Sequence, residues 1–216
     1  ISAGKVKLNG HPVKLGDKGT LADLITVSGE RVYLPRKKQY RYLMLYKPRG
    51  YVTTTSDELN RRCVMDLLED VEERVYPVGR LDKDTEGLLL ITDDGALSHA
   101  LMSPNRHVEK EYEAVVDGVL AADAVSRFEQ GMTLRDGTEC KPAKLEILET
   151  EPELRVRVTL KEGKYHQVKR MIAAVGGTVT ALKRLRLGGL WLDKTLAPGE
   201  FRELTQEELE KLTSQT

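Results

Sequence analysis

Alternating polar and apolar residues form the clearest pattern along the chain. In ELRVRVTL, Arg155, Arg157 and Thr159 alternate with apolar side chains, which predicts a strand with one face toward solvent. In EYEAVV, every second side chain from Tyr112 onward falls on one apolar face, which predicts another strand. Further strands are predicted at residues 40–48, 74–79, 87–92, 144–149 and 178–192.

Helical spacing is strongest in KYHQVKRMIAAVGG. Val168, Met171, Ile172 and Val175 recur at positions i, i+3, i+4 and i+7, and Gly176 follows as a stop signal. The pattern therefore predicts an amphipathic helix. Further helices are predicted at residues 63–71, 95–102 and 121–131, and after Thr205, which is placed to form a capping box with Glu208.

The order of these elements favours an α+β fold. Strands outnumber helices and do not alternate strictly with them, so we expect a mixed, largely antiparallel sheet with flanking helices over residues 41–216. Residues 1–40 form a separate small unit, in which Asn9-Gly10 and Ser28-Gly29 predict two hairpins. The polar, basic residues 35–41 have the composition of a linker.

Composition is that of an ordinary globular protein, with 40% hydrophobic and 31% charged residues. No apolar stretch approaches the length of a membrane span, and no signal-peptide pattern is present, so we expect a cytoplasmic protein without membrane contact. Cys63 and Cys140 are isolated, which suggests neither a disulfide framework nor a structural zinc site. Phosphate-loop and dinucleotide motifs are absent as well.

Charge distribution is more informative than net charge, because Lys plus Arg and Asp plus Glu are equal at 34 each. Residues 161–190 hold seven basic residues against one acid, Glu162, and a second basic cluster lies at residues 35–50. Such local clusters suit a phosphate-binding groove, but either one alone is as compatible with an ordinary solvated basic face.

The segment GRLDKDTEGLLLITDDG concentrates acids next to an apolar run. Asp82, Asp84, Glu86, Gly87 and Asp93 match positions 1, 3, 5, 6 and 12 of a calcium loop, yet the preceding segment has Pro and Gly where an entering helix is needed. A glycosidase pair is a second possibility, but no aromatic-rich sugar cleft is evident. The third is a catalytic carboxylate between strands.

Several segments together resemble a known family. GRLDKDTEGLLLITDDG, SPNRHVEKEYEAVVDG and EGKYHQVKRMIAAVGG follow in the order of three motifs of the pseudouridine synthases, in the branch called the RsuA family. RYLMLYKPRGYVTT upstream and LKRLRLGGLWLD downstream fit as well, so the resemblance covers about residues 40–205.

The resemblance implies an enzyme that isomerises a uridine within RNA, without a cofactor or a metal ion. By position, Asp82 is the catalytic nucleophile, Tyr112 stacks on the uracil and helps to remove the C5 proton, and Lys169 is the basic partner of Asp82. The helical pattern agrees, since Lys169 borders the apolar face. A nearby ammonium group also favours the ionised carboxylate that a nucleophile requires.

The remaining candidates contact RNA. The target base has to leave its stack, and the resemblance links this step to Arg80, while Val168 packs against the base. Further RNA contacts are expected from the basic helix and the residues before it, namely Lys164, His166, Gln167 and Arg170.

The amino-terminal residues 1–40 resemble the second half of a small, S4-like RNA-binding module shared with a ribosomal small-subunit protein. The basic helices that precede this half in such modules are not in this chain, so we expect a partial module with weakened RNA affinity.

The RNA target is suggested by Tyr165 and His166, because KYHQVKRM resembles the small-subunit branch of the family. We therefore expect a monomeric enzyme that modifies one uridine of 16S ribosomal RNA, alone or in an assembly intermediate. Two hypotheses compete with this one: a 23S ribosomal RNA synthase of the same family and, in a different class, a non-catalytic RNA-binding or ribosome assembly protein.

Overall fold

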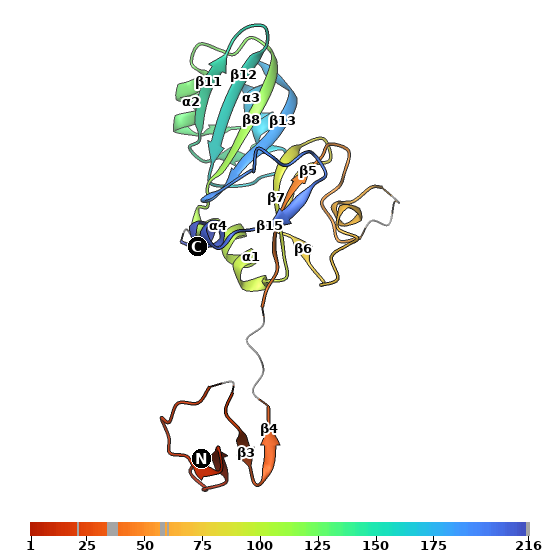
Figure 1. Cartoon of the computed structure of the whole chain (residues 1–216). Helices are drawn as coiled ribbons and strands as arrows, with labels where there is room; N and C mark the ends of the chain where they lie inside the picture. Colours follow the sequence, from red (N-terminus) through yellow and green to blue (C-terminus); the bar gives the residue numbers. More distant parts are fainter. Residues whose placement is uncertain (21, 34–38, 57–58, 60, 215–216) are drawn as a thin grey trace. The chain divides into compact units, whose positions relative to one another are not determined.

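The protein is described by a computed structural model that covers residues 1–216 except 21, 34–38, 57–58, 60 and 215–216 (Figure 1). The chain divides into two compact units, Ile1–Gln39 and Tyr40–Thr216. Most of the predicted linker at residues 35–41 lies outside the described residues.

The smaller unit is a four-stranded antiparallel sheet. Its strands are β1 (Val6–Leu8), β2 (His11–Pro12), β3 (Ile25–Val27) and β4 (Glu30–Val32), in the order β2-β1-β3-β4. Asn9 and Gly10 join β1 to β2, while Ser28 and Gly29 join β3 to β4, and all four residues have positive φ. Both predicted hairpins are therefore confirmed, with the turn geometry that matches strand twist.

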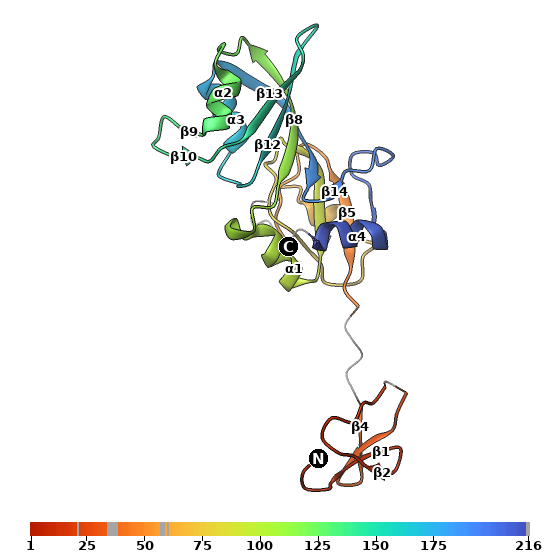
Figure 2. The ribbon, with the colours of Figure 1, turned by 90° about the vertical axis from the view of Figure 1, so that its left-hand side faces the viewer.

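The larger unit is built on one mixed sheet with the strand order β11-β12-β8-β13-β7-β5-β15 (Figures 1 and 2). Among the described strands of this sheet only the β13–β7 pair is parallel, which confirms the predicted mixed, largely antiparallel fold. The strands on this path are β5 (Tyr42–Lys47), β7 (Glu86–Thr92), β8 (Lys110–Gly118), β11 (Lys144–Glu149), β12 (Leu154–Leu160), β13 (Gly177–Leu187) and β15 (Phe201–Glu203). Short additions are β6 (Tyr76–Pro77) on β7, β14 (Leu190–Trp191) on β13, and a separate hairpin of β9 (Met132–Thr133) and β10 (Glu139–Cys140).

Four α-helices flank the sheet in the described part of the chain, and all four were predicted. They are α1 (Gly95–Met102), α2 (Ala124–Gln130), α3 (Gln167–Ala174) and α4 (Gln206–Thr213), the last with the expected capping box. No helix within the described residues is long and apolar enough to cross a bilayer.

The helix predicted over residues 63–71 is wrong in extent. Only a 3-10 turn, η1 (Val64–Leu67), forms there, followed by a short 3-10 helix, η2 (Pro104–Arg106), later in the chain. The carboxylate of Asp66 accepts a hydrogen bond from the Cys63 backbone at 2.7 Å, and Cys63 bridges to Val52. These contacts tie the start of the segment to a neighbouring extended chain, so the apolar spacing produces one tight turn.

Two hydrophobic cores lie on opposite faces of β7. Leu89 and Ile91 belong to the core that also includes residues of α2 and α3, while Leu88 and Leu90 belong to the core that also includes residues of α1 and α4. Alternate residues of a strand point to opposite faces, so a continuous apolar run here indicates a strand buried on both sides. The strand is a rigid base for the acidic turn that precedes it.

Gly87 is where β7 meets β13. The register pairs Gly87 with Arg184, and a Cβ atom on Gly87 would lie 2.2 Å from the Arg184 carbonyl oxygen. The φ angle of Gly87, +108°, is also one that L side chains rarely adopt. Glycine thus allows the close contact that joins the two parts of the sheet beside the acidic turn.

Candidate active site

The turn that carries Asp82 is held by a buried lysine from β5. The Lys47 side chain is 0% exposed, and its ammonium nitrogen donates to the carbonyl oxygens of Thr85 at 2.7 Å and Asp82 at 3.0 Å. It also reaches the carbonyl oxygens of Pro48 at 3.1 Å and Lys83 at 3.4 Å. One cation therefore fixes the backbone on both sides of Asp82.

Burial lowers the pKa of Lys47 to about 8, and the nearby carboxylates of Asp82, Asp84 and Glu86 oppose this shift. At neutral pH the ammonium form therefore predominates. Because an ammonium group has three donors and no acceptor, it suits a position surrounded by carbonyl oxygens.

Two further side chains brace the same turn. Thr53 donates its hydroxyl to the Leu81 carbonyl at 2.8 Å and accepts from the Leu81 backbone at 3.2 Å. Arg49 donates to the carbonyl oxygens of Asp84 at 3.1 Å and Thr180 at 2.8 Å, which links the turn to β13. The Asp82 side chain is thus presented from a backbone held at several points.

The Asp82 carboxylate faces two basic side chains from the α3 region. Lys169 Nζ lies 3.4 Å from its Oδ2 atom, and His166 Nε2 lies 3.5 Å from Oδ1. The Asp82 side chain is 31% exposed, so its charge is shielded only in part by solvent. The predicted pairing of Asp82 with Lys169 is present in the geometry.

Lys169 makes a closer contact to the second acid of the turn. Its ammonium nitrogen donates to Asp84 Oδ1 at 2.6 Å, and this hydrogen bond is the main cause that lowers the pKa of Asp84. The third acid, Glu86, accepts a hydrogen bond from the Tyr46 hydroxyl at 3.1 Å. The carboxylates therefore diverge toward different partners, and no group of three or more metal-binding side chains converges anywhere in the described ranges.

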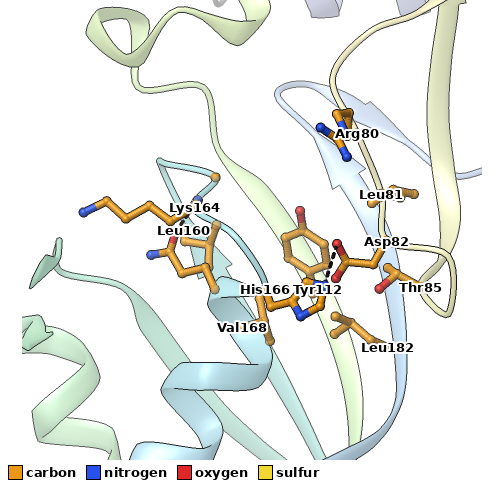
Figure 3. A pocket seen from close by; sticks show the side chains of 12 residues that line it. Arg80, Leu81, Asp82, Thr85, Tyr112, Leu160, Lys164, His166, Val168 and Leu182 are labelled. Carbon is orange, nitrogen blue, oxygen red and sulfur yellow. Dashed lines mark hydrogen bonds and ion pairs between the residues drawn. The ribbon is translucent and has the colours of Figure 1, made fainter. Parts of the chain in front are cut away.

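A small pocket of about 80 Å³ lies beside Asp82 (Figure 3). The Tyr112 ring, only 9% exposed, projects into it from β8, while Val168 from α3 and Leu182 from β13 add apolar surface. The full lining consists of Arg80, Leu81, Asp82, Thr85, Tyr112, Leu160, Gly163, Lys164, His166, Gln167, Val168 and Leu182. A carboxylate next to an aromatic face and apolar walls is suited to a flat, polar ring.

The pocket continues into a wider groove of about 1140 Å³. Arg80, Asp82, Lys164 and His166 line both, and the groove adds the basic residues Arg61 and Lys83. A groove with basic residues along it and a carboxylate at its base can bind a polyanion and act on one of its units.

Most of the predicted site residues are brought together. Asp82, Tyr112, Arg80, Lys164, His166, Gln167 and Val168 line the pocket, and Lys169 contacts Asp82 from its edge. However, the Gln167 side chain is only 4% exposed, and its amide donates to Glu162 at 2.5 Å and accepts from the Lys164 backbone at 2.9 Å. In this state Gln167 orders the start of α3.

Arg170 lies apart from the other predicted residues. It pairs with Asp136 at 2.5 Å and donates to Thr138 at 3.3 Å, beside the β9–β10 hairpin. Consecutive helical residues differ by about 100° in direction, so Lys169 and Arg170 cannot both face Asp82. Arg170 lines a separate hollow on the other side of Tyr165.

Lys47, Arg49 and Thr53 were not identified individually from the sequence. The segment RYLMLYKPRGYVTT fits the family, but a lysine at the end of an apolar strand gives no sign that it is buried against a turn 35 residues later. A buried lysine is rare unless it is paired, so burial is the observation that identifies it.

Comparisons with known proteins agree with this geometry. The family model described as RNA pseudouridylate synthase matches residues 41–174. An uncharacterized RNA pseudouridine synthase of Bacillus subtilis, YtzG, is 44% identical over 98% of this chain and 89% of its own length. The ribosomal small subunit pseudouridine synthase A of Yersinia pestis is 46% identical over 97% of this chain and 88% of its own. A crystal structure of a pseudouridylate synthase superposes with a TM-score of 0.75 at 38% identity, over 98% of this chain and 90% of that one.

Proposed function

The chain belongs to the RNA pseudouridylate synthase family, and we propose that it converts one uridine of 16S ribosomal RNA into pseudouridine, with Asp82 as the catalytic nucleophile. One observation carries this proposal: Asp82 stands on a braced turn, between two basic side chains and an aromatic pocket. That pocket lies at the base of a basic groove.

The reaction is an isomerisation whose atoms balance without a co-reactant. The bond from uracil N1 to ribose C1′ breaks, a bond from C5 to C1′ forms, the C5 proton leaves and N1 gains a proton. Asp82 forms a transient bond to the base or to the sugar while the detached uracil rotates to bring C5 next to C1′. Nothing in this sequence of bonds requires an oxidant or a reductant.

Tyr112 and Val168 hold the uracil in this proposal. The Tyr112 ring offers a stacking face next to Asp82, and its hydroxyl helps to remove the C5 proton. Val168 packs on the base from α3. The pocket of about 80 Å³ is well below the ~300 Å³ at the small end of typical ligand sites, so side chains at its mouth have to move when RNA enters.

Lys169 Nζ and His166 Nε2 lie 3.4 Å and 3.5 Å from the two carboxylate oxygens of Asp82, so both side chains border the nucleophile in this proposal. Burial of a base above the carboxylate would remove water and disfavour its charge, and nearby cations oppose that effect. Lys169 is shared with Asp84, so its distance to Asp82 can shorten when the substrate displaces the outer contact.

Arg80 and the groove support the binding of RNA and the extrusion of its target base. Arg80 lines both the pocket and the groove, where it can fill the gap left by an extruded base. The groove residues Arg61, Lys83 and Lys164 lie where phosphates of the same strand would run. Residues 1–40 belong to an S4-like RNA-binding module in this proposal.

The 16S target is supported by the name of the Yersinia pestis relative and by the Tyr165-His166 pair. In this proposal the enzyme acts as a monomer on ribosomal RNA or an assembly intermediate. Two hypotheses compete with this proposal: a 23S ribosomal RNA target, and a non-catalytic role in ribosome assembly.

Mapping of pseudouridine tests the proposal. Carbodiimide or mass-spectrometric mapping of ribosomal RNA from cells that lack the gene should reveal the loss of one 16S pseudouridine. Wild-type protein should restore it and Asp82→Asn should not, although that variant should still bind RNA. Loss confined to 23S RNA would contradict the target, and full restoration by Asp82→Asn would favour the assembly role.

A further inference from the structure

Tyr165 presents an open aromatic face next to the active site. Its side chain is 76% exposed, although it directly precedes the buried residues of α3. The opposite face of the ring stacks on the His166 imidazole, with centroids 3.9 Å apart and planes within 16°. One face of Tyr165 is therefore covered and the other is available.

The residues next to this ring restrict its orientation. His166 has a left-handed backbone with φ +48°, and its Nε2 atom lies 3.5 Å from Asp82. The Tyr165 carbonyl accepts a hydrogen bond from Arg170 at 3.2 Å. The stacking on His166 and the backbone contact restrict the ring before a ligand arrives, which lowers the entropic cost of stacking a base on it.

A hollow of about 410 Å³ opens beside Tyr165 and is lined by residues of α3 and of the loop between β9 and β10. Leu134, Ala173 and Ala174 give it apolar walls. This volume lies within the ~300–1,000 Å³ typical of sites for small ligands. Tyr165 also lines the groove that contains Asp82, so this one side chain borders both the hollow and the path proposed for RNA.

We infer that this hollow is a second nucleotide subsite, which binds the base of a nucleotide adjacent to the target uridine against Tyr165. The inference rests on the proposed function. Single-stranded RNA is recognised mainly by bases that stack on aromatic side chains, and an extruded uridine leaves its neighbours unstacked. A strand with its uridine at Asp82 brings such a neighbour past Tyr165.

The charges around the hollow favour RNA as the occupant. Arg170 is neutralised by Asp136 and acts as part of the wall. Arg135 lines the hollow, is exposed and has no ion-pair partner within the described ranges, so it can contact a phosphate at the rim. An aromatic face, apolar walls and one cation at the edge match the base and the phosphate of a nucleotide.

The test combines a protein change with an RNA change. The probes are a 16S fragment centred on the mapped uridine, the same fragment made abasic at each neighbouring position in turn, and oligouridylate. Tyr165→Ala should weaken binding of the intact RNAs by about 10-fold to 100-fold, whereas Tyr165→Phe should retain it. One abasic fragment should bind wild type and Tyr165→Ala equally, since the contact is then missing in both.

Trp191→Ala is the matched control, because Trp191 is also exposed, at 52%, but lies on β14 away from the groove. The subsite would be overturned if both alanine variants lost the same RNA affinity. It would also be overturned if Tyr165→Ala lost the same affinity for every abasic fragment. Binding is measured by fluorescence anisotropy, independently of turnover. If the wild-type protein formed no pseudouridine, only the proposed function would be overturned. The subsite would still be tested by comparing the binding of oligouridylate to wild type and to Tyr165→Ala.

Discussion

Lys169 forms its shortest ion pair with Asp84, with 2.6 Å between the ammonium nitrogen and Oδ1. The Asp84 side chain is 64% exposed, so this contact lies at the solvent edge of the site. The same ammonium is 3.4 Å from Asp82. Lys169 is therefore shared between two carboxylates of unequal exposure, a difference that the spacing of the acids in the sequence did not indicate.

Asp84→Asn should leave measurable activity, while Asp82→Asn should remove pseudouridine formation below detection. Exposed ion pairs contribute about 1 kcal/mol or less, so loss of the Asp84 charge should change kcat/KM by no more than about 10-fold. Tritium release from C5-labelled uridine in RNA measures both rates. If the Asp84 variant were as inactive as the Asp82 variant, the assignment of the nucleophile would be in doubt.

Lys169→Met should lower kcat by about 100-fold, because it removes the cation closest to the Asp82 carboxylate. Lys169→Arg should retain most of the activity, since the positive charge remains at the edge of the pocket. Arg170→Met is the matched control on the next helical position. It should have a much smaller effect on kcat, because Arg170 pairs with Asp136 outside the pocket.

Urea unfolding should distinguish these effects from misfolding. Lys169 is partly exposed, so its loss should change the free energy of unfolding by less than about 1 kcal/mol. A Lys169→Met protein that is fully active, or an Arg170→Met protein that loses as much kcat, would contradict the roles given to the two residues.

The family resemblance pointed to Asp82, Tyr112 and Val168, and the structure brings the three side chains to one pocket, where their roles stay predictions. The sequence did not indicate the exposure of Tyr165, nor that Arg170 turns toward Asp136. The second depends on the loop between β9 and β10, which carries Asp136 and is far from Arg170 in the sequence. Lys47 was missed for a similar reason, since its partners are backbone carbonyl groups that no residue pattern marks.

Lys47→Met should destabilise the protein and slow catalysis together. The change leaves the carbonyl groups of Asp82 and Thr85 without their buried donor, which should cost about 2–4 kcal/mol in the free energy of unfolding at neutral pH. Urea unfolding and tritium release on the same preparation measure both effects. A variant of wild-type stability would show that the lysine does not hold the turn.

The stability of the wild type should also respond to pH through Lys47. Burial lowers its pKa to about 8 in the folded protein, while the unfolded chain titrates near 10.5. Between these values the unfolded chain binds more protons, so this group favours folding increasingly as pH rises. From pH 7.5 to 9.5 the stability of wild type relative to Lys47→Met should grow by about 1–2 kcal/mol. A constant difference would show that the pKa of Lys47 is not lowered.

Gly87→Ala should be far more damaging than an alanine at another glycine of positive φ. At Gly87 the new Cβ would lie 2.2 Å from the Arg184 carbonyl oxygen, and φ is +108°. The backbone of both β7 and β13 has to shift to accommodate it, which should lower the free energy of unfolding by more than about 3 kcal/mol. Because Gly87 follows the braced turn, activity should fall with stability.

Gly137→Ala is the matched control, since Gly137 has φ +82° with nothing within 4 Å of the added Cβ. This variant keeps the unfavourable backbone angle without a steric clash, so the free energy of unfolding should fall by only about 1 kcal/mol. Urea unfolding of the two variants therefore separates backbone strain from the close contact between β7 and β13. Equal losses would mean that the contact at Arg184 relaxes readily, and the turn at Asp82 would then depend on Lys47 rather than on the junction of these strands.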